Sequence, residues 1–242
     1  MNKSFFKILK RIWILGGIGF TGWLIYSMQA HGVEPAYFQS SSRVDVEEED
    51  DFISFATKQK SPNILIFFPG ALVDVDAYVP LCYQLAENGI KTYLIKMPWR
   101  QAKLGYNKVK DLQILADTSL TYILAGHSQG AKMAAQFVYE NPGLIDKAVL
   151  LATTHPRDID LSKSSTRFMK IYGSCDGVAK EKDIEVNKIK LPESTFYKRI
   201  EGANHSQFGY YGFQLGDESA TISREKQHQM ALSSILQFIN EP

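Results

Sequence analysis

The stretch TYILAGHSQGAKMAAQFVYE, residues 121–140, holds the pattern G-x-S-x-G centred on Ser128. We predict a strand over residues 121–125 and a helix over residues 131–139, so that the serine lies at the turn between them. The bare five-residue pattern is weak evidence, because a chain of this length can contain it by chance. Its position between a strand and a helix predicts a strained serine whose hydroxyl is exposed as a nucleophile.

The residues around Ser128 are expected to have separate roles. Gly126 and Gly130 are predicted to be glycines for steric reasons, because the sharp turn leaves no room for a Cβ two residues from the serine. The backbone amide of Gln129 is expected to be one donor of an oxyanion hole, since it belongs to a helix N-terminus that points at the serine. His127 flanks the nucleophile and is not predicted to be its base.

A serine hydroxyl needs an adjacent imidazole, itself oriented by a carboxylate, and in this setting the chain order is serine, acid, histidine. Of the five histidines, only His205 and His228 lie far enough beyond Ser128. His228 falls in the predicted helix, where a solvated face is the simplest interpretation. His205 follows the predicted strand 195–200 in a loop of small residues, and we predict that it is the base; the alternative is a surface or structural histidine.

Asp176 is the predicted acid, because it directly follows the predicted strand 167–172 within Gly-Ser-Cys-Asp-Gly. The other aspartates are placed less well: Asp158 and Asp160 follow an earlier strand, Asp183 lies in a charged region, and Asp146 precedes its strand. The alternative for Asp176 is a turn-forming role, which is common for aspartate beside glycine.

The second oxyanion donor is expected in the loop Pro69-Gly70-Ala71-Leu72, which follows the predicted strand 63–68. Ala71 is the first choice and Leu72 the second. The alternative is that this loop is a plain turn.

The rest of the chain alternates short apolar runs with helical patterns, which predicts an α/β fold with a doubly wound, mostly parallel sheet flanked by helices. Run 64–68 is continuously apolar, as in a strand covered on both faces. Ligands should bind beyond the carboxyl ends of such strands. The predicted strands are 63–68, 92–96, 121–125, 147–152, 167–172 and 195–200, and the predicted helices are 78–88, 131–139 and 223–239, with a less certain one near 108–117.

Residues 1–30 are predicted to be a membrane anchor or signal segment. Lys3, Lys7, Lys10 and Arg11 precede the uncharged stretch 12–28, which is longer than the apolar region of most signal peptides. Cleavage after Ala30 would place a methionine at position −3, where a small residue is preferred. We therefore expect a transmembrane helix with the remaining chain outside the cytoplasm, in the periplasm or at a bacterial cell surface; the alternative is secretion after cleavage.

Three glycines of this segment, Gly17, Gly19 and Gly22, match the dinucleotide-binding pattern G-x-G-x-x-G. That fingerprint must follow a strand and open a helix, whereas these glycines lie in an apolar run after a cationic stretch. We reject a dinucleotide site. Residues 31–51 are expected to form a linker and a first turn that contains the acidic run 47–51, and residues 52–242 the hydrolytic domain described above.

The composition excludes some classes of partner. Lys and Arg total 27 against 26 acidic residues, so the net charge of +1 offers no basic field for nucleic acid. The two cysteines, Cys82 and Cys175, match no zinc, haem or redox spacing and are expected to be free thiols.

These residues together resemble the α/β-hydrolase superfamily, and within it the small bacterial hydrolases of the carboxylesterase or dienelactone-hydrolase type. The resemblance spans about residues 60–242 and implies no cofactor and no metal. Dienelactone hydrolases use a cysteine nucleophile, so Ser128 favours ester chemistry over lactone specialisation. The oxyanion loop has Pro-Gly where many relatives have His-Gly. The motifs that carry the resemblance are Phe68-Pro69-Gly70, residues 78–89, Met97-Pro98, Gly126 to Gly130, Asp176-Gly177, Asn204-His205 and Phe208-Gly209; the block Tyr210 to Arg224 is also similar, with no chemistry assigned.

The predicted function is therefore a serine hydrolase that cleaves carboxylic esters of a small-molecule or acylated substrate. The short connection 153–166 leaves room for only a small lid, which favours short acyl esters, whereas a membrane tether favours lipids or acylated envelope polymers. Alternatives are an acyltransferase or peptidase with the same residues, or a non-catalytic binding module. The oligomeric state is not predicted.

Overall fold

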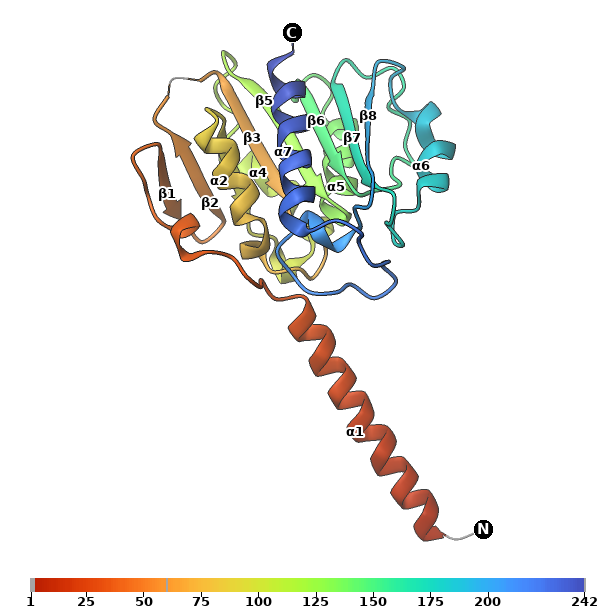
Figure 1. Cartoon of the computed structure of the whole chain (residues 1–242). Coiled ribbons are helices and arrows are strands. Elements are labelled where there is room, and N and C mark those ends of the chain that lie inside the picture. The colour runs from red at the N-terminus through yellow and green to blue at the C-terminus, as the bar shows by residue number, and fades with distance from the viewer. Residues whose placement is uncertain (1–2, 60, 242) are drawn as a thin grey trace.

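The computed structural model describes residues 3–59 and 61–241. Residues 1–2, 60 and 242, which fall within the predicted anchor and hydrolase ranges, lie outside the described residues. A long helix, α1 (Lys3–Ser27), projects from a domain in which one sheet is covered by helices (Figure 1). The stretch from Phe6 to Ser27 is long and apolar enough to cross a membrane, and its most apolar 18-residue window is not buried against the domain.

The sheet has eight strands in the order β1-β2-β4-β3-β5-β6-β7-β8. Strands β3 to β8 run parallel to one another, whereas β1 pairs with β2 and β2 with β4 in antiparallel fashion. This confirms the doubly wound, mostly parallel sheet. The strands are β1 (Val44–Glu48), β2 (Phe52–Thr57), β3 (Asn63–Phe68), β4 (Lys91–Ile95), β5 (Thr121–His127), β6 (Lys147–Leu151), β7 (Arg167–Gly173) and β8 (Phe196–Ile200).

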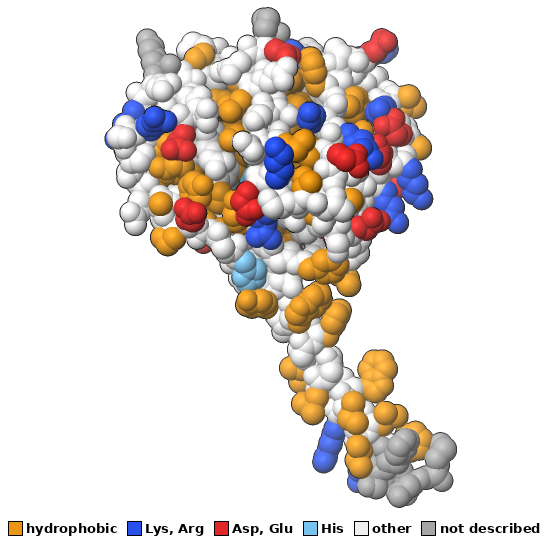
Figure 2. Space-filling model, in the orientation of Figure 1, with side chains coloured by type: hydrophobic (Ala, Val, Ile, Leu, Met, Phe, Trp, Pro, Cys, Tyr) orange, Lys and Arg blue, Asp and Glu red, His pale blue; other side chains and the backbone are white. Residues whose placement is uncertain are grey.

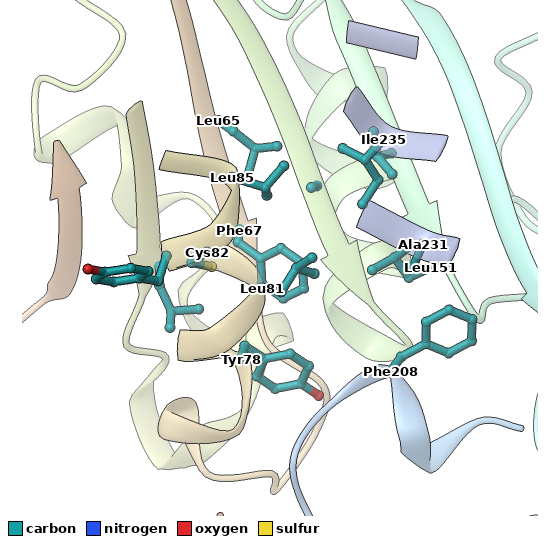
Figure 3. Close-up of a cluster of buried hydrophobic side chains, with 14 of the residues drawn as sticks. Leu65, Phe67, Tyr78, Leu81, Cys82, Leu85, Leu151, Phe208, Ala231 and Ile235 are labelled. Carbon is teal, nitrogen blue, oxygen red and sulfur yellow. The ribbon is translucent and has the colours of Figure 1, made fainter. Parts of the chain in front are cut away.

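Helices cover both faces of the sheet, and the alternation of side chains along β3 shows why its run had to be continuously apolar. Leu65 and Phe67 join the core on the face of α2 (Val79–Glu87) and α7 (Arg224–Asn240), drawn in Figure 3. Ile64 and Ile66 join the core on the face of α5 (Gln129–Glu140). The shorter helices are α3 (Ala102–Gly105), α4 (Lys108–Asp111) and α6 (Glu181–Asn187), with 3-10 turns at Pro35–Phe38, Val75–Tyr78, Pro98–Arg100, Lys188–Lys190 and Ser206–Phe208.

The structure differs from the sequence-based expectation near the start of the domain. Residues 44–48, placed in the linker and the acidic turn, form the edge strand β1, and the predicted domain boundary at residue 52 falls between β1 and β2. Strand β1 carries carboxylates because an edge strand exposes alternate side chains to water. The turn between the two strands is closed by the amide of Glu49, which donates to the Phe52 carbonyl. The uncertain helix near 108–117 is helical only over α4.

The parallel strands place all their following loops at one edge of the sheet. Strand β3 leads back to β4 on one side, while β5 and the later strands extend the sheet on the other side. Such a reversal opens a crevice beyond the carboxyl ends of the two central strands. The loop with Ala71 follows β3 and the turn with Ser128 follows β5, so both lie at this point.

Candidate active site

Ser128 forms the whole turn between β5 and α5. Its backbone is held at φ 54° and ψ −115°, a conformation that L-residues rarely adopt and that is tolerated where a site requires it. A Cβ on Gly126 would lie 2.5 Å from the carbonyl carbon of Gly130, and a Cβ on Gly130 would lie 2.0 Å from the carbonyl oxygen of Phe68. The two glycines are therefore what lets β5, α5 and the β3 strand end meet this closely.

His205 and Asp176 form a buried hydrogen-bonded pair. The Nδ1 atom of His205 lies 2.9 Å from Oδ2 and 3.1 Å from Oδ1 of Asp176. Oδ1 also accepts the backbone amides of Val178 and Ala179, at 2.9 and 2.6 Å. A carboxylate that already accepts two amides serves as an acceptor toward the imidazole as well, so the proton of the imidazole is held on Nδ1.

This tautomer leaves the lone pair of Nε2 available as a base. Among the residues that the structure describes, Nε2 of His205 has no hydrogen-bond partner although it is buried. The ring of His127, the residue before Ser128, lies near the ring of His205, with 4.7 Å between the two centroids. A direct bond from the Ser128 hydroxyl to Nε2 is not formed in this structure, and such bonds often tighten only when substrate binds.

The candidate oxyanion donors differ in what their amides do. The amide of Leu72 donates to the carbonyl of Arg100 at 2.7 Å, and Leu72 has a left-handed backbone with φ 65°. Because that amide already donates to Arg100, Leu72 is the weaker candidate for an oxyanion donor. Gln129 is the first residue of α5, so its amide is one of those that a helix N-terminus leaves without an intrahelical acceptor. Ala71 and Gln129 are thus the better pair.

His127 has a structural role that the sequence did not reveal. The Tyr78 hydroxyl accepts the Gly70 amide at 3.1 Å and lies 2.8 Å from Nδ1 of His127. With that amide accepted, the hydroxyl proton is best donated to Nδ1. Burial holds the pKa of His127 well below its ordinary value and raises that of Tyr78, so both groups stay neutral. The pair fixes Gly70, next to the predicted donor Ala71.

Asp217 lies in the block Tyr210 to Arg224, to which no chemistry was assigned, and it connects the two halves of the His205 and Asp176 pair. Its Oδ1 accepts the amides of His205 at 3.1 Å and Gly177 at 3.3 Å. Its Oδ2 accepts the amide and the hydroxyl of Ser206, at 2.8 and 2.7 Å. Asp217 therefore holds together the loops of the predicted acid and the predicted base. The only signal in the sequence was an aspartate beside glycine, which usually marks a turn.

Helix α7 holds the His205 loop from the other side. Gln227, fully buried near the start of α7, donates to the carbonyl of Asn204 at 2.9 Å and accepts its amide at 3.1 Å. His228 is also buried, which corrects the prediction of a solvated face: its ring packs edge-on against Tyr210. Burial, with the charge of Arg224, lowers the pKa of His228 to about 4.

Two of the alternative acids have other partners. Asp158 is exposed, with its Oδ2 atom 3.9 Å from Nζ of Lys132, and Asp146 accepts the Tyr122 amide at the start of β5.

Cys82 and Cys175 are free thiols. Among residues 3–59 and 61–241, no three His, Cys, Asp or Glu side chains form a group that could hold a metal ion. The expectation that the reaction needs no metal and no cofactor stays a prediction.

Solved structures with the same fold include Est1E from Butyrivibrio proteoclasticus, at 13% identity, a TM-score of 0.58 and coverage of 83% of this chain and 100% of that one. A soluble variant of the monoglyceride lipase of Saccharomyces cerevisiae is 11% identical, with a TM-score of 0.59 and coverage of 84% and 96%. An α/β-hydrolase enzyme from a lagoon-sediment metagenome of Mar Chica, Morocco, is 15% identical, with a TM-score of 0.58 and coverage of 80% and 99%.

A comparison with curated protein sequences finds no match. The sequence model described as the alpha/beta hydrolase family matches residues 64–229, which include the elbow, the buried His205 and Asp176 pair and Asp217. With the sheet order and the turn at Ser128 in agreement, this chain belongs to the alpha/beta hydrolase family.

Proposed function

We propose that the protein is a serine hydrolase that cleaves carboxylic esters through an acyl-enzyme intermediate on Ser128. The observation that carries the proposal is the buried His205 and Asp176 pair, whose free Nε2 belongs to an imidazole that packs against the residue preceding Ser128. A general base held in one tautomer near a partly buried serine with a strained backbone is the arrangement that acyl transfer requires.

In the first step, Oγ of Ser128 attacks the ester carbonyl carbon and its proton passes to Nε2 of His205. Asp176 stabilises the imidazolium that forms, and the amides of Gln129 and Ala71 stabilise the negative charge on the carbonyl oxygen. Collapse of the tetrahedral intermediate expels the alcohol, which takes the proton from Nε2. The acyl group then remains on Ser128.

In the second step, water attacks the acyl carbonyl while Nε2 of His205 takes its proton. The second tetrahedral intermediate breaks at the bond to Oγ, which regains its proton from the imidazolium, and the carboxylic acid leaves. A fold relative whose name denotes an ester-cleaving enzyme, the yeast monoglyceride lipase, supports ester substrates at the level of the fold.

An acyltransferase or a peptidase would use the same groups and differ only in acceptor or leaving group. In the case of a non-catalytic module, the strained φ of Ser128 and the unpaired Nε2 of His205 would have no use. These two features favour an enzyme.

Labelling with a fluorophosphonate and peptide mapping tests the proposal. We expect a single adduct on Ser128 in the full-length protein, together with turnover of an acetate ester. Ser128→Ala should remove the adduct and lower turnover on the order of 10⁶-fold. Ser119→Ala, which changes an exposed loop serine, is the matched control and should label and turn over normally. Absence of an adduct, or an activity loss under about tenfold in Ser128→Ala, would reject the assignment.

A further inference from the structure

The C-terminal end of the apolar helix α1 and the residues that follow it contact the domain directly. The carbonyl of Ser27 accepts the amide of Gly212 at 2.7 Å, and the carbonyl of Met28 accepts the amide of Asp74 at 2.8 Å. Ala30 forms a β-bridge with Tyr211, and Met28 and Ala30 pack against the core. Cleavage after Ala30 would remove these contacts, which supports an uncleaved anchor.

The partners of this junction belong to the loops that build the candidate active site. Asp74 lies in the loop that follows β3 and carries Ala71, and Arg100, which donates to both Asp74 and the side chain of Gln29, follows β4. The segment of Tyr211 follows His205 after β8, and the ring of Tyr211 lies 6.3 Å from that of His127. Helix α1 therefore joins the domain at the carboxyl edge of the parallel strands, the edge that bears Ser128 (Figure 1).

Large apolar side chains are exposed on the same loops. Trp99 is 87% exposed, in the turn whose Arg100 carbonyl binds the Leu72 amide, and Leu104 of α3 is 58% exposed. Phe213 and Leu215, 45% and 61% exposed, follow the segment that contacts Ser27. Figure 2 shows apolar side chains gathered where α1 meets the domain. An apolar patch of this kind marks an interaction surface, and tryptophan favours the interface between lipid and water.

We propose that this edge of the domain lies against the membrane that α1 spans, and that the site takes acyl esters of membrane lipids directly from the bilayer surface. A membrane is the partner proposed for this edge because the apolar span leads directly into it. The span ends at Ser27, and Ser27 contacts the loops that carry the apolar side chains. The inference rests on the proposed ester hydrolysis. It selects long acyl chains over the short esters that the small lid favoured.

The test compares two substrates on the full-length protein in phosphatidylcholine vesicles: a water-soluble acetate ester and a monoacylglycerol with a long chain. The variant Trp99→Asn with Leu215→Ser removes two apolar contacts, and asparagine tolerates the left-handed backbone at position 99. The control, Ile189→Ser, changes an 80% exposed apolar residue that follows α6. Every variant keeps α1 and therefore its membrane attachment. A difference in rate between variants therefore reports how this edge of the domain contacts the bilayer, and not whether the protein binds vesicles.

We expect the double variant to hydrolyse the acetate ester as the wild type does and the monoacylglycerol about tenfold more slowly, with the control unchanged on both. Equal loss in the double variant and the control, or no loss, would overturn the inference while leaving ester hydrolysis intact. Absence of acetate-ester turnover in the wild type would instead reject the proposed function.

A second measurement does not depend on activity. The chain has three tryptophans, and replacing Trp13 and Trp23 by phenylalanine leaves Trp99 as the only one. Its fluorescence should be quenched by lipids brominated near the headgroup. Quenching no stronger than by a water-soluble quencher would place this edge in solvent and overturn the inference.

Discussion

The role of His205 depends on one proton at Nδ1, which the Asp176 carboxylate holds in place. An amide at position 176 would offer the imidazole a donor as readily as an acceptor and would favour the wrong tautomer. We predict that Asp176→Asn lowers kcat on the order of 10⁴-fold and leaves KM nearly unchanged. Steady-state kinetics with the acetate ester measures this. An effect of less than about tenfold would contradict an orienting role.

Asp217 accepts hydrogen bonds from both loops that carry the acid and the base, and we predict that it is a positioning residue. An amide there turns an acceptor into a donor facing the backbone amides. Asp217→Asn should therefore lower kcat about 10- to 100-fold with little change in KM, by misplacing His205. Asp160→Asn, in an exposed loop, is the control.

A structural role alone would have a different signature for Asp217. Loss of folded protein lowers the fraction of molecules that react with a fluorophosphonate, whereas misplacement of His205 lowers the rate in every molecule. We expect full labelling at a reduced rate. Incomplete labelling with a normal rate per labelled molecule would contradict positioning.

Residue identity and chain order led to Ser128, Asp176 and His205 as a predicted group, and the structure brings the last two into direct contact; the group as a catalytic site stays a prediction. The roles of Asp217 and of the Tyr78 and His127 pair could not be predicted in this way. Each depends on contacts between residues 8 to 49 positions apart in the chain, and no local pattern distinguishes them from a turn aspartate or a core aromatic.

The loop after β3 and the elbow after β5 are joined through Tyr78 at the start of α2. Tyr78→Phe would leave the Gly70 amide and Nδ1 of His127 buried without their partner. We predict a loss of about 1–3 kcal/mol in the free energy of unfolding. Turnover should also fall, because Gly70 precedes the predicted donor Ala71. Tyr139→Phe, on an exposed part of α5, is the control; equal stability of the two variants would contradict the proposed network.

Each of the six predicted strands corresponds to a strand of the sheet, whereas β2, which is also buried, was not predicted. The predicted strand at 63–68 matches β3, and the predicted helix at 131–139 lies within α5. Edge strand β1 was not predicted, because its sequence Val-Asp-Val-Glu-Glu is typical of an acidic, solvated turn. Its pairing with β2 stabilises it, and that pairing is tertiary information.

Lys170 of β7 is a charge-bearing side chain that is buried in the fold. Its ammonium donates to the carbonyl of His155 at 2.7 Å, and burial lowers the pKa of Lys170 to about 7. Between pH 7 and the ordinary lysine pKa, the unfolded chain holds a proton that the folded protein does not. The free energy of unfolding should therefore increase as the pH rises through this window. Below about pH 7 the contribution of Lys170 to that free energy is constant.

Lys170→Met removes this titration, although it also leaves the carbonyl of His155 unpaired at every pH. We predict that the unfolding free energy of the wild type, relative to Lys170→Met, increases as the pH rises from about 7 to about 10. Urea unfolding of the full-length proteins in detergent measures the difference. Lys163→Met, an exposed lysine, is the control. A difference that does not change with pH would contradict the lowered pKa.

The apolar helix α1, the sheet edge and the elbow meet at one place, and the proposed ester cleavage there depends on a covalent bond to Ser128. Stopped-flow hydrolysis of p-nitrophenyl acetate, with mass analysis of the quenched protein, tests this most directly. We predict a rapid release of nitrophenolate equal to the protein present, with the acetyl group on the peptide that contains Ser128. Linear release without a burst from an active enzyme, joined to an unmodified Ser128 peptide, would contradict the account.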